Sequence, residues 1–210
     1  MKALQRESRL VSIEGGEGAG KSTAINALRG ALLAHGEQVV CTREPGGTPL
    51  AERIRELLLD PALEPATAHA ELLLMFAARA QHVHETVLPA LRTGAWVLCD
   101  RFTDSSHAYQ GAGRGIDPGF IAALEREVVG IEPGLTFLLD IDVAAGRARI
   151  RGRGEPDRIE RERDAFFQRV REGFLARAQA DPARFRVVDA SADAESVANR
   201  VVALLEAYRA

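Results

Sequence analysis

A glycine-rich segment that ends in a lysine and two hydroxyl residues follows the first apolar stretch of the chain. Its residues are Gly15, Gly16, Glu17, Gly18, Ala19, Gly20, Lys21, Ser22 and Thr23. The first eight fit the pattern G-x-x-x-x-G-K-[ST] at the junction of a predicted strand and a predicted helix. Glycines let successive backbone N–H groups converge on a phosphate, and the start of a helix adds the positive end of its dipole. The segment therefore predicts a nucleoside triphosphate site with Lys21 on the β- and γ-phosphates.

Two oxygen-bearing side chains are candidates for holding a divalent cation beside that triphosphate. Ser22 follows the lysine, and Asp100 ends the apolar run at residues 96–99. In phosphoryl-transfer sites of this kind the metal takes a hydroxyl from the loop and a carboxylate from another strand end. We therefore expect Mg²⁺ at Ser22 and Asp100. The alternative is that Asp100 only caps backbone groups and is neutralised by Arg101.

Arginines follow the second and third apolar stretches, where a second phosphate would have to lie. Arg43 belongs to the sequence T-R-E-P-G-G-T at residues 42–48, and Arg101 directly follows Asp100. An arginine can bind a phosphate through two parallel donors. The alternative for Arg43 is a solvated loop arginine.

Aromatic and amide side chains near these arginines are candidates for binding a base and a sugar. Phe76 and Arg79 lie three residues apart on a predicted helix, so a ring and a guanidinium occupy adjoining positions. From spacing alone, Phe76 is more simply a core residue and Arg79 the partner of a surface carboxylate. Tyr109 and Gln110 offer an aromatic face and an amide after the third predicted strand.

The histidines form no catalytic or metal-binding pattern. His82 and His84 are two residues apart on a predicted helix and so face different ways, and the others are scattered. We expect them all to be structural or solvated. A phosphate monoester has a second pKa of about 6, so its oxygens are nucleophilic at neutral pH without a general base. Positioning and charge neutralisation are then sufficient for phosphoryl transfer.

The strands and helices that must position these residues alternate along the chain. Short apolar runs predict five buried parallel strands, at residues 10–14, 38–42, 96–100, 135–140 and 185–189. Helical patterns cover residues 21–34, 49–59, 66–92, 118–129, 143–151, 160–180 and 194–208. This alternation predicts an α/β fold of the P-loop NTPase class, a doubly wound five-stranded parallel sheet flanked by helices. Ligands should bind at the C-terminal ends of the strands.

Length and composition exclude several classes of protein. The 210 residues favour one compact domain over residues 1–210. With 27 basic and 30 acidic residues, the chain lacks the cationic field that would favour nucleic acid or an anionic membrane. Its charged start does not resemble a signal peptide, and no apolar stretch reaches the roughly 18 residues of a membrane span. Cys41 and Cys99 lie far apart without C-x-x-C spacing, so we expect no disulfide and a cytoplasmic location.

One segment, at residues 147–163, departs from the average composition. Its arginines are Arg147, Arg149, Arg151, Arg153, Arg158, Arg161 and Arg163. Such a cationic segment with interspersed glycines is typical of a lid. The phosphate loop alone does not name the acceptor, but the chain lacks the Asn-Lys-x-Asp motif of GTPases. A short chain with an arginine-rich lid that excludes water favours a small phosphotransferase.

Together these motifs resemble the thymidylate kinase family nearly from end to end. The resemblance runs through residues 14–23, 42–48, 76–79, 100–101 and 108–111 and the arginine-rich lid. The T-R-E-P-G-G-T and Y-Q-G elements carry it, because the phosphate loop is shared by many families. It implies an enzyme that transfers the γ-phosphoryl group of ATP to dTMP with Mg²⁺, giving dTDP. It also implies a homodimer formed through helices, for which the apolar run at residues 72–78 is a candidate.

The resemblance also implies roles for single residues on the acceptor side. Glu17 would accept from the 3′-hydroxyl of the deoxyribose, and Arg43 and Arg101 would hold the monophosphate. Phe76 would stack on thymine, and Arg79 would bind the edge of the base.

Further residues would complete the acceptor pocket and the metal site. Ser105 and Gln110 would line the base pocket, Tyr109 would pack beneath the sugar and exclude a 2′-hydroxyl, and Asp100 would hold the Mg²⁺ shell.

The same comparison implies a lid arginine in catalysis. Some members carry an arginine within the phosphate loop, where this chain has Gly18, and others carry it in the lid. The transition-state cation is then expected from the lid, as in the bacterial type, with Arg153 first and Arg149 and Arg158 as alternatives. Two other readings stay open. The chain could be a nucleoside monophosphate kinase with another base preference, or a P-loop protein that senses ATP without catalysis.

Overall fold

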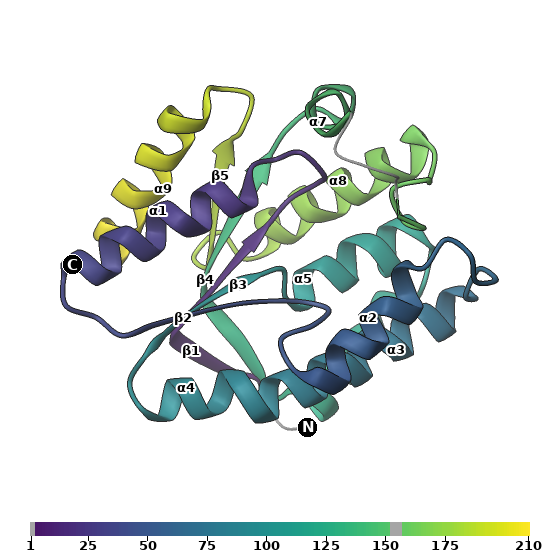
Figure 1. Ribbon diagram of the computed structural model, residues 1–210, viewed down its shortest axis with the longest axis horizontal. Coiled ribbons are helices and arrows are strands. Elements are labelled where there is room, and N and C mark those ends of the chain that lie inside the picture. The colour runs from purple at the N-terminus through teal and green to yellow at the C-terminus, as the bar shows by residue number, and fades with distance from the viewer. Residues whose placement is uncertain (1–2, 152–156) are drawn as a thin grey trace.

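Five parallel strands form the central sheet of the computed structural model, which describes residues 3–151 and 157–210. Their order within those residues is β2-β3-β1-β4-β5 (Figure 1). The bounds are β1 Gln5–Glu14, β2 Val39–Arg43, β3 Trp96–Asp100, β4 Ile131–Asp140 and β5 Phe185–Asp189. In the middle of the sheet Val11 of β1 lies level with Leu98 of β3 and Leu135 of β4. The doubly wound α/β fold predicted from the sequence is confirmed.

Two long helices cover one face of the sheet. They are α1 (Lys21–Ala34) and α9 (Ala194–Arg209), which lie side by side in Figure 1. Successive strand residues point to opposite faces, so alternate positions of β1 serve different layers. Val11 and Ile13 pack with α1 and α9, whereas Leu10 belongs to the core of the other face.

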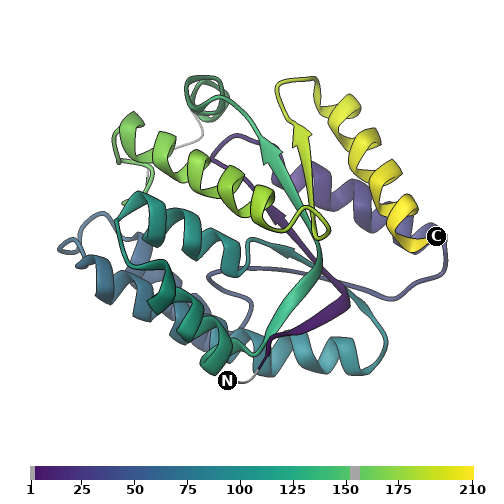
Figure 2. The same ribbon diagram turned by 180° about the vertical axis from the view of Figure 1, so that it is seen from behind.

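The opposite face is covered by α3 (Ala68–His82), by α8 (Asp164–Ala180) and by a composite helix. That composite helix consists of α5 (Thr103–Ser106) and the π-helical turn η2 (His107–Gly113), and α8 lies against it (Figure 2). Phe166 and Phe174 of α8 form a core with Tyr109 of η2 and Leu138 of β4.

The remaining helical segments surround this core. They are α2 (Pro49–Leu59), η1 (Val83–Val87), α4 (Leu88–Arg92), α6 (Pro118–Leu124), η3 (Glu125–Val129) and α7 (Val143–Ile150). The predicted helix at residues 66–92 is thus α3, η1 and α4 in succession, and the one at 118–129 is α6 and η3. Among the described helices, none has both the length and the hydropathy that crossing a bilayer requires. Cys41 and Cys99 are free, as expected.

The composite helix at residues 103–113 is the element that the apolar pattern missed. Its sequence is rich in small and polar residues and has no apolar periodicity. Buried ion pairs hold it instead, because Asp104 accepts from Arg184 at 2.6 Å and from Arg177 at 2.9 Å.

Boundaries elsewhere shift for local reasons. The predicted helix at 160–180 begins only at Asp164, because Asp157 accepts from the N–H groups of Ile159 and Glu160 and closes a separate turn. β1 and β4 begin earlier than expected, since Gln5 pairs with Ile131 beyond a register shift.

Candidate active site

The phosphate-binding loop lies between β1 and α1, as the motif predicted. Gly15, Gly18 and Gly20 have positive φ, and at Gly15 a Cβ would overlap the carbonyl oxygen of Leu139. These positions therefore require glycine. Lys21 begins α1 and folds its Nζ back to the carbonyl oxygens of Gly15 (3.3 Å) and Gly16 (3.1 Å). Burial, and then the positive charge of Arg101, lower the pKa of Lys21.

Arg101 lies beside this loop in an uncommon backbone conformation. Its φ is 70°. Among the described residues, Arg101 is the one non-glycine residue with a positive φ. Its Nη1 donates to the carbonyl oxygen of Gly15 at 3.0 Å, and its Nη2 donates to Glu17 at 2.6 Å. Burial opposes ionisation of Glu17, but the charges of Arg101 and Lys21 hold its pKa below the ordinary value. Residues 84 positions apart in sequence therefore form one charged rim.

The residues proposed to hold Mg²⁺ lie on the same rim. Asp100 ends β3, level with Arg43 at the end of β2. The Oδ1 atom of Asp100 is buried and has no hydrogen-bond partner within the described part of the chain. A buried carboxylate oxygen without a donor costs free energy unless a cation or water satisfies it. Since Ser22 lines the same cavity, the donor set fits a hard divalent cation.

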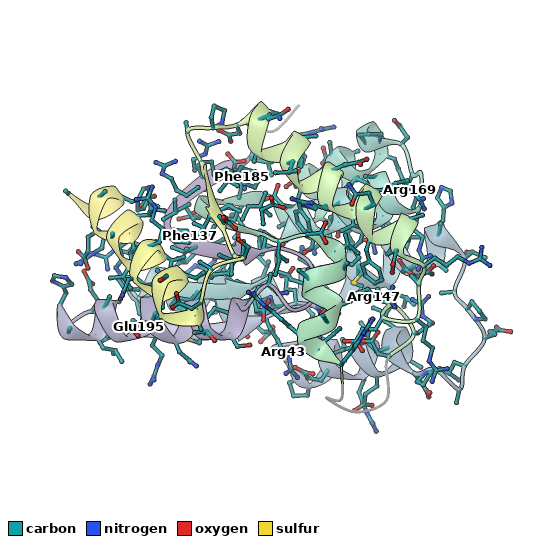
Figure 3. All side chains as sticks on the ribbon, turned by 90° about the horizontal axis from the view of Figure 1, so that it is seen from above. Arg43, Phe137, Arg147, Arg169, Phe185 and Glu195 are labelled. Carbon is teal, nitrogen blue, oxygen red and sulfur yellow. The ribbon has the colours of Figure 1, made fainter. Side chains whose placement is uncertain are left out.

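One cavity of about 880 Å³ opens over these strand ends. Arg43 and Arg147, labelled in Figure 3, line it from β2 and α7. The sequence-predicted residues that line it are Glu17, Gly18, Gly20, Lys21, Ser22, Thr23, Arg43, Arg79, Asp100, Arg101, Ser105, Tyr109 and Gln110. The structure therefore brings the phosphate loop and nearly all of the expected acceptor residues to one place.

Four predicted residues are not among the lining residues described. Gly15 and Gly16 line a smaller neighbouring cavity of about 30 Å³, and Ala19 is buried. Phe76 is 2% exposed and packs in the core, with the guanidinium of Arg79 4.8 Å from its ring centre. A role of Phe76 against the base stays a prediction.

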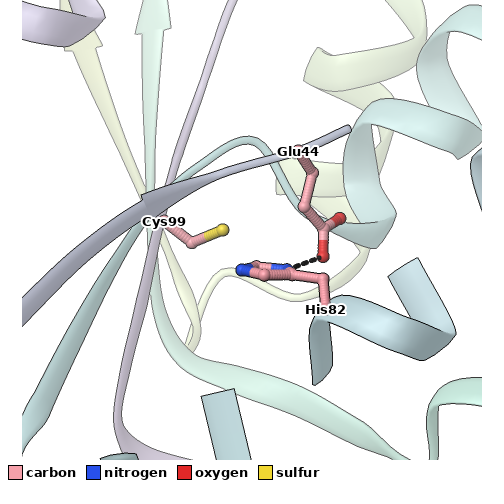
Figure 4. A group of neighbouring side chains, drawn as sticks. All are labelled: Glu44, His82 and Cys99. Carbon is pink, nitrogen blue, oxygen red and sulfur yellow. Dashed lines mark hydrogen bonds and ion pairs between the residues drawn. The ribbon is translucent and has the colours of Figure 1, made fainter. Parts of the chain in front are cut away.

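Arg79 is oriented by buried partners that the sequence analysis did not single out. Its Nε donates to Glu44, its Nη1 to Ser106 at 3.0 Å and its Nη2 to the carbonyl oxygen of Phe102 at 3.1 Å. The other oxygen of Glu44 lies 2.9 Å from Nδ1 of His82 (Figure 4). Glu44 follows Arg43 in a loop motif, so only the fold shows that it faces α3.

Glu44, His82 and Cys99 place their ligand atoms within 4.8 Å of one another. Each is already engaged: His82 Nε2 lies 2.7 Å from Thr42 Oγ1, and the Cys99 thiol donates to the carbonyl oxygen of Arg101. Burial raises the pKa of Cys99 well above its ordinary value, which disfavours a thiolate ligand. The cluster is a satisfied polar network, and His82 is structural as expected.

The composite helix of α5 and η2 presents three predicted residues to the cavity. Ser105 donates its hydroxyl to Glu14 at 2.6 Å, the Tyr109 hydroxyl donates to Glu17 at 3.4 Å, and Gln110 Nε2 donates to Glu71 at 2.9 Å. Burial, with the charge of Asp104, raises the pKa of Glu14 to about 8.

The described arginines of the segment at residues 147–163 are held in different ways. Arg149 donates to the carbonyl oxygens of Ala190 (2.7 Å) and of the next two residues, and Arg158 donates to Glu71 and to the carbonyl oxygen of Leu58 (both 2.7 Å). Arg151 is exposed and lines the cavity. Arg153, the first candidate for catalysis, lies outside the described residues.

Comparison with known proteins places the chain beside one group of enzymes. The family model described as thymidylate kinase matches residues 13–201. The thymidylate kinase of Chromohalobacter salexigens is 57% identical over 200 residues, 94% of each chain. That of Alcanivorax borkumensis is 52% identical, over 96% of this chain and 98% of its own. A crystal structure of thymidylate kinase from Ehrlichia chaffeensis superimposes with a TM-score of 0.77 at 32% sequence identity. The match covers 94% of this chain and 98% of that one.

Proposed function

The chain belongs to the thymidylate kinase family, and from this premise we propose how its cavity transfers the γ-phosphoryl group of ATP to dTMP, giving ADP and dTDP. The observation that carries the proposal is the shared cavity: the phosphate loop and the cationic acceptor residues line one volume of about 880 Å³. Donor and acceptor phosphates can therefore meet without leaving the protein. In-line transfer needs this proximity more than it needs a general base.

On the donor side, the loop amides and Lys21 bind the triphosphate. Lys21 now points at its own loop carbonyls, at 3.1 and 3.3 Å, and can exchange these weak bonds for phosphate oxygens. The residues that would hold Mg²⁺ are Ser22 and Asp100, and the unpartnered Oδ1 of Asp100 supports this assignment. The chemistry that Mg²⁺ would supply there is neutralisation of the negative charge of the triphosphate.

On the acceptor side, Arg43 and Arg101 hold the monophosphate. Nη2 of Arg43 donates to the Glu52 carboxylate at 3.0 Å. The Arg43 side chain is about half exposed, so its guanidinium can turn toward a ligand. Arg101 is fixed by Gly15 and Glu17 and needs no rearrangement. We assign Glu17 as the acceptor of the hydrogen bond from the 3′-hydroxyl of the sugar.

The base is bound between α3 and the composite helix. Arg79 reaches the edge of the base, with Ser105 and Gln110 beside it and Tyr109 beneath the sugar, while Phe76 supplies a ring to stack on. The bonds of Arg79 to Glu44, Ser106 and Phe102 pre-orient its guanidinium. Pre-orientation lowers the entropy cost of binding.

Residues 147–163 act as the lid of this proposed single kinase domain and supply the transition-state cation. We keep Arg153 as the first candidate. Arg149 donates to three carbonyl oxygens and Arg158 donates to Glu71, so both guanidinium groups already have structural partners.

The proposed setting is a cytoplasmic homodimer that binds neither nucleic acid nor membrane. Exposed apolar side chains gather on the neighbouring segments α2, α3, α6 and η3. They are Leu50, Leu57, Leu73, Phe120 and Val128. Of the apolar run at 72–78, Leu73 is 50% exposed, whereas Leu72 and Phe76 belong to the core.

A comparison of acceptors tests the assignment. With ATP and Mg²⁺, the values of kcat/KM for dTMP, dUMP, dGMP, AMP and CMP should be highest for dTMP. A higher value for another monophosphate would reassign the base. The failure to form any nucleoside diphosphate would favour a nucleotide sensor instead.

A further inference from the structure

Glu71 of α3 is a buried carboxylate with several donors around it and no part in the reaction as proposed. It is 1% exposed. Its Oε1 accepts from Gln110 Nε2 at 2.9 Å and from Arg114 Nε at 3.3 Å. Its Oε2 accepts from Arg158 Nη2 at 2.7 Å and from Arg114 Nη2 at 3.2 Å. One carboxylate therefore joins a residue of the acceptor pocket to an arginine of the lid.

This environment keeps Glu71 ionised. Burial opposes ionisation, but the hydrogen bonds from Gln110 and Arg158 and the charge of Arg114 hold the pKa of Glu71 below its ordinary value. An ionised carboxylate has acceptor sites only. Neither oxygen of Glu71 can donate a hydrogen bond.

An acceptor-only neighbour decides how the Gln110 amide is turned. The amide carries two N–H donors at one end and a carbonyl oxygen at the other. If the amide turned over, its oxygen would face the Glu71 carboxylate, with two acceptors in contact inside the protein. The N–H end must therefore face Glu71. The carbonyl end is left for a ligand in the cavity that Gln110 lines.

We propose that Glu71 is a positioning residue for base specificity, which holds the Gln110 amide with Oε1 toward the acceptor base. The site then selects a base edge that offers an N–H and disfavours one that offers a bare ring nitrogen. Thymine carries N3–H where cytosine carries an unprotonated N3. The inference rests on the proposed function, in which Gln110 lines the base pocket.

Arg158 of the lid segment helps to keep the Glu71 carboxylate in place. Arg158 is fixed at the end of α2, where its Nε donates to Leu58 and its backbone N–H to Leu59 at 3.2 Å. Its charge is therefore held at Glu71 and does not compete for the ligand.

The decisive variant is Glu71→Gln, which keeps the shape of the side chain but can both accept and donate. The Gln110 amide can then turn over and pair either way. The two acceptors to compare are dTMP and 5-methyl-dCMP, which differ only at the edge of the base. We expect the ratio of their kcat/KM values to fall about 10- to 100-fold, because a mismatched buried hydrogen bond is no longer enforced. Glu56→Gln, at an exposed carboxylate of α2, is the matched control.

A reciprocal exchange separates positioning from general damage. In the double variant E71Q/Q110E the amide and the carboxylate trade places, and a carboxylate oxygen again faces the base. The preference for dTMP should return at least in part. A double variant no more selective than E71Q, or an unchanged ratio in folded E71Q, would overturn the inference. A wild-type protein that does not phosphorylate dTMP would instead overturn the proposed function.

A measurement on the wild type keeps the inference testable if E71Q does not fold. In ¹³C,¹⁵N-labelled protein saturated with ¹⁵N-labelled dTMP, a through-hydrogen-bond coupling should connect N3 of thymine with Cδ of Gln110, because the amide oxygen accepts from the N3–H group. If the Gln110 N–H protons instead showed such a coupling to the base, the amide would be turned the other way, and the inference would be wrong.

Discussion

Arg101 combines backbone strain with a fixed charge. A non-glycine residue at positive φ costs about 1–3 kcal/mol and persists only where its surroundings enforce it. Here they do: the Arg101 N–H donates to the carbonyl oxygen of Ile13 at 3.0 Å, and the next N–H, of Phe102, donates to Glu14 at 2.7 Å. The turn places a guanidinium against the phosphate-binding loop, at Gly15 and Glu17.

Lys21 is the lysine of the phosphate-binding loop, at the start of α1. Lys21→Ala should lower kcat at least about 100-fold, because it removes a preorganised cation from the charge that develops in the transition state. The unfolding midpoint should change little. Arg200→Ala, which removes an exposed cation from α9, serves as the matched control. A Lys21→Ala enzyme with nearly normal turnover would argue against a phosphotransferase.

Single residues differ in how far the sequence could assign them. Lys21, Asp100 and Arg101 follow from spacing, because strand ends converge in a parallel sheet. Glu44 and Glu71 do not, since their partners lie 35 and 39 positions away, and no local pattern marks a buried carboxylate.

Helix α7 is packed unusually close to the phosphate loop. A Cβ on Gly18 would overlap the carbonyl oxygen of Gly146, and a Cβ on Gly146 would overlap that of Glu17. Two backbones therefore touch at a pair of glycines. This contact leaves no room for an arginine side chain at position 18.

Gly146→Ala should therefore push α7 away from the loop. We expect a loss of about 1–3 kcal/mol in the free energy of unfolding, together with a lower kcat. Gly30→Ala is the control, because that glycine of α1 has open space around it and should gain roughly 0.5–1 kcal/mol. Chemical denaturation of both variants gives the comparison. If Gly146→Ala and Gly30→Ala were equally stable, the contact at Gly146 would not hold α7 against the phosphate loop.

The elements α1, α2 and β3, which have a clear apolar pattern, were predicted to within a residue or two. The composite helix of α5 and η2 was not, because its stability comes from Asp104 and two arginines that are distant in the sequence. This missed helix is also the one that presents Ser105, Tyr109 and Gln110.

For the whole molecule, Glu14 links folding to pH. Its folded pKa, about 8, lies above the value of about 4.3 expected in the unfolded chain. Between these values the folded protein holds a proton that the unfolded chain has released. The contribution of Glu14 to stability therefore falls as pH rises through that window.

Glu14→Gln should remove this dependence, because an amide does not titrate. The stability of Glu14→Gln relative to the wild type should increase from pH 5 to pH 8 in urea denaturation. Parallel stability curves for the two proteins would contradict a protonated Glu14.

The apolar surface on α2, α3 and α6 gives a prediction about assembly. Leu73→Glu should convert a dimer to monomers, because it buries a charge in an apolar interface. Light scattering after size exclusion measures the mass. Leu33→Glu is the control, since Leu33 is similarly exposed, at 46%, on α1 across the sheet. Equal masses for both variants and the wild type would locate any interface elsewhere.

In the proposed reaction two nucleotides bind end to end over the same strand tips. The most direct test is calorimetric titration of dTMP into protein saturated with a non-hydrolysable ATP analogue and Mg²⁺. Because the phosphate loop and the acceptor residues line different parts of the cavity, dTMP should still bind with a stoichiometry of one. If the analogue abolished dTMP binding by competition, ATP and dTMP would share one site, which would contradict end-to-end binding.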